Sequence, residues 1–111
     1  MAMAISDIPR GTTRSISVEI TISGSNPDIS GDKVTLTIKS DKGDADPGVL
    51  QEDADVTTSG ASGVALFDLS TTDTDIEPGR YEYDIVWYLA GGDEHVIDSG
   101  LVTFVERVSD L

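Results

Sequence analysis

The segment from residue 79 to residue 89 reads Gly-Arg-Tyr-Glu-Tyr-Asp-Ile-Val-Trp-Tyr-Leu, and it constrains the fold more than any other part of the chain. Large apolar residues occupy its alternate positions, whereas Glu82 and Asp84 fall between them. This period of two is the spacing of a β-strand with one buried face. The same parity places Tyr88 on the outward face. The inward residues of this predicted core strand are Tyr81, Tyr83, Ile85, Trp87 and Leu89.

Other segments alternate in the same way, over residues 15–22, 33–39 and 64–69. A last strand is expected over residues 95–105, with a bend at Ser99-Gly100 because glycine inside a strand often marks a bulge. No long window has helical spacing, so we expect no substantial helix. Short strands separated by turn signals predict an all-β sandwich or small barrel. The inward residues expected in the first three segments are Ile16, Val18, Ile20, Ile22, Val34, Leu36, Ile38, Ala65, Phe67 and Leu69.

Charge excludes several classes of partner. The 111-residue chain carries 21 acidic and 7 basic residues, for a net charge of −14. A nucleic acid or an anionic membrane requires a basic surface, so we expect neither as a partner. The chain has no cysteine, which rules out disulfides. Its N-terminus lacks the basic and apolar regions of a secretory signal, so we expect synthesis in the host cytoplasm without secretion.

The sequence offers little for catalysis, and we predict that the protein is not an enzyme and has no cofactor. His95 is the only histidine, so a Ser-His-Asp triad has one possible centre, and no nucleophile-elbow sequence accompanies it. We interpret His95 as an exposed residue at the edge of a turn. Carboxylates recur in pairs, as at Asp53 and Asp55, but paired-carboxylate chemistry also needs an apolar cleft that raises one pKa.

Calcium binding is the more serious alternative, because loops with several carboxylates supply the oxygen ligands that calcium prefers. Two loops are rich in carboxylates, over residues 41–46 and 73–77, and neither has the spacing of the helix-loop-helix calcium motif. Solvated carboxylates are the other interpretation of these loops, so no metal site is assigned. The candidate ligands are Asp44, Asp46, Asp73, Asp75 and Glu77.

Three residues are candidates for contacts with another molecule. Arg10 and Arg14 flank Gly-Thr-Thr in the only basic cluster, which could dock on an acidic subunit or form an ordinary surface turn. Tyr88 is the one outward ring. We expect a flexible arm over residues 1–7, the sandwich over residues 8–107 and a short tail over residues 108–111. The arm could add as a strand to another copy.

The order of motifs resembles a known group of domains. An alternating strand follows Ile-Pro-Arg-Gly-Thr-Thr-Arg at residues 8–14, and Val-Thr-Leu-Thr-Ile-Lys follows Gly-Asp-Lys at residues 31–39. Pro-Gly-Arg-Tyr-Glu-Tyr-Asp-Ile comes at residues 78–85, and Ser-Gly-Leu-Val-Thr-Phe-Val closes the pattern at residues 99–105. Over about residues 8 to 105, the chain is similar to the immunoglobulin-like β-sandwich domains of tailed phages and prophages. It resembles in particular the N-terminal domain of the upper baseplate protein family.

The resemblance implies a single immunoglobulin-like sandwich of about 6–8 antiparallel strands. It also implies a virion component of the tail or baseplate, which acts through contacts with other virion proteins and possibly with itself. The baseplate family usually continues into a longer region, whereas this chain stops at Leu111. A capsid decoration protein or a protein of the head-tail connector region is therefore an alternative. A carbohydrate- or receptor-binding module on the same fold is a further alternative.

Overall fold

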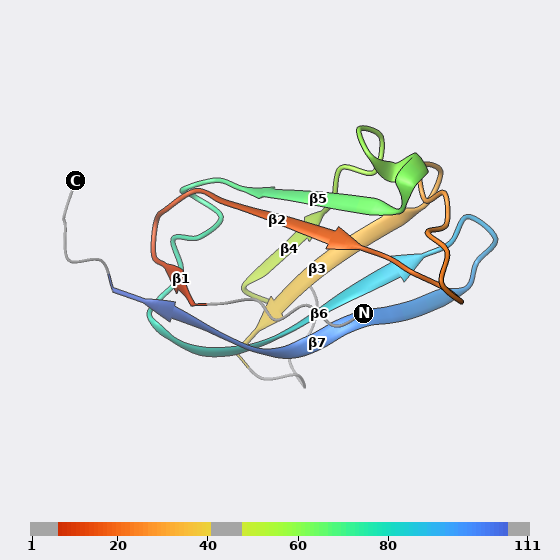
Figure 1. Ribbon diagram of the computed structural model, residues 1–111. Coiled ribbons are helices and arrows are strands. Elements are labelled where there is room, and N and C mark those ends of the chain that lie inside the picture. Colours follow the sequence, from red (N-terminus) through yellow and green to blue (C-terminus); the bar gives the residue numbers. More distant parts are fainter. Residues whose placement is uncertain (1–6, 41–47, 107–111) are drawn as a thin grey trace.

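The computed structural model describes residues 7–40 and 48–106, and this part of the chain folds into strands and turns (Figure 1). One short 3₁₀ turn, η1 (Gly60–Ser62), precedes the fifth strand. The all-β prediction is confirmed. The strands are β1 (Ile8–Pro9), β2 (Arg14–Glu19), β3 (Lys33–Lys39), β4 (Leu50–Asp53), β5 (Val64–Leu69), β6 (Gly79–Tyr88) and β7 (Glu94–Val105).

The strands form two sheets, one of five strands in the order β1-β7-β6-β3-β4 and one of two strands, β2-β5. In Figure 1, β2 and β5 form a layer across the larger sheet. Strand β1 runs parallel to β7, pairing Ile8 with Phe104, whereas the other strand pairs are antiparallel. The larger sheet is therefore mixed, which corrects the prediction of antiparallel strands alone. Strand β1 was not predicted because a strand of two residues is too short to show an alternation of apolar and polar positions.

Strand parity places the predicted faces correctly in the centre of the molecule. Strands β3 and β5 have the predicted bounds, and β6 begins at Gly79 and ends at Tyr88. Leu89 follows β6 and is only partly buried against the core. Side chains of both sheets fill the space between the layers, and burying such apolar surface drives folding. The largest fully buried side chains include Phe67, Phe104, Ile8, Ile29, Leu36, Ile38 and Ile85.

Ile22 does not face the core as predicted, because 49% of its surface is exposed. The N–H groups of Ile22 and Ser25 each donate to the other residue's carbonyl. Between them, Ser23 and Gly24 have φ angles of 52° and 79°, the backbone of a tight turn that suits the twist of a hairpin. The chain therefore reverses at Ile22, beyond the residues paired with β5.

The irregularity in β7 lies before the predicted position. The register with β6 shifts between Ile85 and Val86, so that Ile85 pairs with Asp98 and Val86 pairs with Val96. Ile97 is the extra residue, whereas Gly100 stays in register with Tyr83. A Cβ at Gly100 would lie 3.5 Å from the Tyr83 ring. The bulge therefore lies at Ile97 and not at Gly100, where a Cβ would make an ordinary van der Waals contact with that ring.

Hydrogen bonds from aromatic side chains fix both ends of β6. Near its end, the indole N–H of Trp87 donates to the Asp32 carboxylate at 2.9 Å, and the same carboxylate accepts the Ala90 N–H at 2.9 Å. Near its start, the Tyr81 hydroxyl donates to the Glu77 carbonyl at 2.6 Å. The buried polar atoms of both rings are therefore paired, which avoids the free-energy penalty of burying them alone.

Asp55 links the two sheets. Its N–H and carbonyl exchange hydrogen bonds with Leu66 of β5, directly after β4 leaves the larger sheet. Its carboxylate accepts four hydrogen bonds, from the N–H and hydroxyl groups of Thr57 and Thr58. These donors hold the pKa of Asp55 far below its ordinary value of 3.8, the Thr58 hydroxyl most strongly.

Trp87→Ala is expected to lower the free energy of unfolding by about 3–5 kcal/mol, because it leaves a cavity in the core and removes a partner of Asp32. Tyr88→Ala, one residue away on the outer face, should have a much smaller effect. Urea denaturation of both variants measures the difference. Equal or reversed effects would contradict the face assignment of β6.

Asp55→Asn is expected to lower the melting temperature at neutral pH. Because folding lowers the pKa of Asp55, its ionised form stabilises the native state at pH values above the unfolded pKa of about 4, and this stabilisation is lost as the pH falls below it. The difference in melting temperature between the variant and the parent protein should therefore become smaller at acidic pH. Asp93→Asn is the control, since among the described residues no side-chain hydrogen bond reaches the Asp93 carboxylate. An Asp55→Asn effect that persists unchanged at low pH would contradict this account.

Candidate functional site

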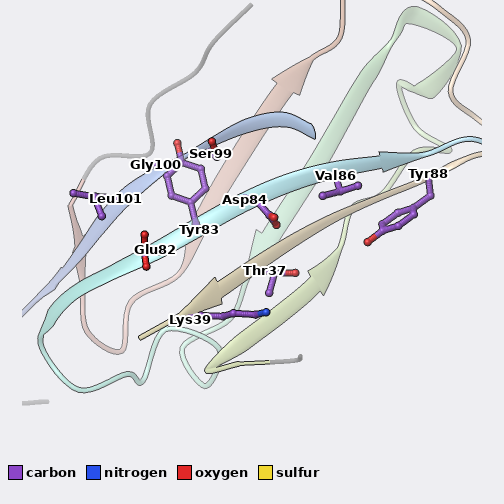
Figure 2. A pocket seen from close by; sticks show the side chains of 10 residues that line it. All are labelled: Thr37, Lys39, Glu82, Tyr83, Asp84, Val86, Tyr88, Ser99, Gly100 and Leu101. Atoms are coloured by element: carbon purple, nitrogen blue, oxygen red, sulfur yellow. The ribbon is translucent and has the colours of Figure 1, made fainter. Parts of the chain in front are cut away.

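A hollow of about 390 Å³ lies on the outer face of the five-stranded sheet. Strands β3, β6 and β7 all contribute to it. Figure 2 shows its lining side chains, with Tyr88 toward one end and Leu101 toward the other. Most of the lining residues alternate along their strands with buried core residues, so the pattern that forms the core also forms this outer surface. The lining residues are Thr37, Lys39, Glu82, Tyr83, Asp84, Val86, Tyr88, Ser99, Gly100 and Leu101.

We name this hollow the outer-face pocket, and its lining includes Tyr83, a residue that is itself buried. Its ring lies beside Gly100, and its hydroxyl donates to the Asp98 carboxylate at 2.8 Å. Asp98 also accepts the Ser99 N–H at 3.0 Å. The hydrogen bond to Asp98 thus ties Tyr83 to β7 next to Gly100, which has no side chain.

The predicted interaction residue Tyr88 lies in this pocket and faces outward as its parity requires. The Lys33 ammonium is 5.0 Å from the centre of the Tyr88 ring, a distance that permits a cation–π contact. Lys39, Glu82, Asp84 and Tyr88 all take part in further interactions. The lining therefore combines two tyrosines, Tyr83 and Tyr88, with charged side chains that already take part in interactions.

The two predicted arginines lie at the other end of the sandwich. The Arg10 Nε donates to the Asp75 Oδ1 at 2.9 Å, and Glu106 approaches at 3.9 Å. The hydrogen bond to Asp75 raises the pKa of Arg10. Arg14 Nη1 is 3.4 Å from the Asp7 carbonyl. Arg10 thus joins three segments of its own chain, and docking by either arginine remains a prediction.

The candidate calcium ligands do not converge within residues 7–40 and 48–106, where no group of three or more His, Asp or Glu side chains could hold a metal ion. The Asp73 carboxylate accepts the Ser70 N–H, and the Ser70 hydroxyl accepts the Asp73 N–H, which closes a turn. Asp75 pairs with Arg10, while Glu77 uses its carbonyl to bind Tyr81. Asp44 and Asp46 lie outside the described residues.

One carboxylate points toward the interior without an observed partner in this part of the chain. Glu52 pairs across the sheet with Leu36, whose side chain is buried. Burial raises the pKa of Glu52, and the nearby Asp73 and Asp53 charges raise it further. A charge turned inward on an edge strand discourages another chain from pairing there. Strand β4 is therefore a poor edge for strand addition.

A second hollow was not predicted from the sequence. It has a volume of about 240 Å³ and lies between residues 19–22, which end β2 and follow it, and residues 95–97 of β7. His95 lies here, with its ring centre 5.6 Å from that of Trp87. Val96 and Ile97 are consecutive apolar residues, which departs from the alternation of a strand with one buried face. That break in the period was the sequence signal of the bulge and of an exposed apolar edge.

Comparison with models of known protein families gives no match, and comparison with curated proteins gives none either. None of the helical segments that the structure describes has the length and apolar character required to cross a membrane.

Proposed function

We propose that this protein is a non-enzymatic structural component of a bacteriophage or prophage particle, in the tail or baseplate or associated with them. It acts through contacts with other virion proteins. The proposal combines the resemblance of its motifs to phage sandwich domains with an edge strand that is open to a partner.

The immunoglobulin-like form of the sandwich is supported by its strand order. One sheet pairs β2 with β5, and the other contains β3, β6 and β7 as neighbours, as in the two sheets of that fold. The bond from the Tyr81 hydroxyl to the Glu77 carbonyl has the form of the tyrosine corner, in which a tyrosine near the start of the sixth strand binds backbone a few residues upstream.

The open edge of β7 is the observation that carries the proposed role. The strand spans Glu94–Val105, yet β1 pairs only with Phe104 and Val105 on its outer side. Within the described ranges, no other strand pairs with the outer edge of residues 94–101. Such an edge is a template for strand addition by another chain.

The alternatives differ in support. A capsid decoration protein or a connector-region protein would use the same edge, so the fold does not separate these particle positions. The carbohydrate-binding alternative has less support, because stacking on sugars would rely on the single ring of Tyr88, which already contacts Lys33.

Fractionation of particles from the source bacterium tests the proposal. Particles released by induction and banded in a density gradient should contain the protein at a fixed copy number relative to head and tail proteins. Quantitative mass spectrometry of headless tails and tail-less heads would assign it to one of the two. Recovery of the protein only in the particle-free fractions of a lysate that contains intact particles would overturn the proposal.

A further inference from the structure

The hollow beside β7 is open to solvent and has both apolar and polar lining residues. We call it the β2–β7 groove, and its apolar lining comes from Ile20, Ile22, Trp87, Val96 and Ile97. Ile22 is 49% exposed and Val96 is 64% exposed. Large apolar side chains that gather beside an open strand edge are typical of protein contact sites.

Main-chain groups along the same edge point away from β6. The Leu89 N–H donates to the Asp93 carbonyl, and in an antiparallel ladder the bonded pairs alternate with unbonded ones. Glu94 and Val96 therefore turn their N–H and carbonyl groups outward. On the C-terminal side of the bulge, the Val105 carbonyl accepts the Arg10 N–H. Every second residue from Val105 back to Leu101 therefore also turns its N–H and carbonyl groups away from β6. The groove and the outward groups of β7 lie side by side.

The charges around this site have one sign. Glu19 lines the groove, and Glu94 and Asp98 flank its β7 residues in the chain. No arginine or lysine of the described ranges lines the groove. The basic residues of the described ranges lie outside the groove lining; they are Arg10, Arg14, Lys33, Lys39 and Arg80.

We propose that the β2–β7 groove and the adjacent edge of β7 bind an extended segment of a partner protein in which apolar residues alternate with lysine or arginine. Main-chain bonds to Glu94 and Val96 align the segment. One set of its side chains enters the groove, and the other set meets the acidic rim. This inference rests on the proposed function, since it names the surface and the chemistry of the virion partner.

The charge argues for such a partner over a second copy of the same chain. Two copies would bring together net charges of −14 each, with Glu94 and Asp98 on both edges. Like charges across an interface oppose association, whereas complementary charges accelerate it and set specificity. An apolar segment without basic residues would fill the groove and leave the acidic rim without partners.

Titration with a synthetic capped peptide of alternating lysine and valine tests this inference on the full chain. Trp87 is the only tryptophan and lines the groove, so its fluorescence should report binding. The amide protons of Glu94 and Val96 should exchange more slowly in the complex. A peptide that alternates glutamate and valine should not bind, and added salt should weaken the lysine peptide.

Val96→Lys should weaken binding of the lysine peptide by at least about tenfold, because it places a positive charge on the edge and removes apolar surface. Val49→Lys is the matched control, with the same change at a valine that is 42% exposed elsewhere. Thermal melting verifies that both variants fold. Absence of peptide binding, or equal weakening by both substitutions, would overturn the inference. Dimerisation that Val96→Lys abolishes would overturn it in favour of a second copy. Particle fractionation does not depend on this peptide, so either proposal can fail alone.

Discussion

The central position of β6 governs the rest of the structure. It pairs with β3 on one side and β7 on the other, and its inward side chains Tyr81, Tyr83, Ile85 and Trp87 are all buried. A one-residue slip would turn those side chains outward and bring Glu82 and Asp84 into the core, where unpaired charges are costly. Burial therefore fixes the register of β6, and β6 in turn positions both neighbouring strands.

The same constraint places the open surface at the edge of the sheet. Because residues 82–88 of β6 are paired on both sides, the main chain of this stretch is not available to a partner. The two-stranded sheet is narrower than the five-stranded sheet, and the turn after β2 leaves Ile22 exposed beside β7. Strand β4, at the opposite edge, carries the inward Glu52. The described part of the molecule thus has one edge that combines outward main-chain groups with an apolar groove.

The alternation of apolar and polar residues was sufficient to predict the central strands, because every second side chain of these strands faces the core. It was insufficient where long-range contacts decide the conformation. Strand β1 exists because its residues meet Phe104 and Val105, and Ile22 is exposed because a tight turn follows it. The bulge lies at Ile97, where the register between β6 and β7 shifts, and not at Gly100. Parity predicted that Tyr88 faces outward, but it did not predict the outer-face pocket. The β2–β7 groove joins segments far apart in sequence and had only the Val96-Ile97 pair as a signal.

Amide hydrogen exchange of the isolated protein, resolved by NMR for each residue, tests most directly whether β6 is central and the outer edge of β7 is open. We expect slow exchange throughout β6 and an alternating pattern in β7, with His95 and Gly100 protected and Val96 and Leu101 exchanging rapidly. Slow exchange at Val96 and Leu101 as well would show that this edge is covered in the free protein, and it would contradict the account.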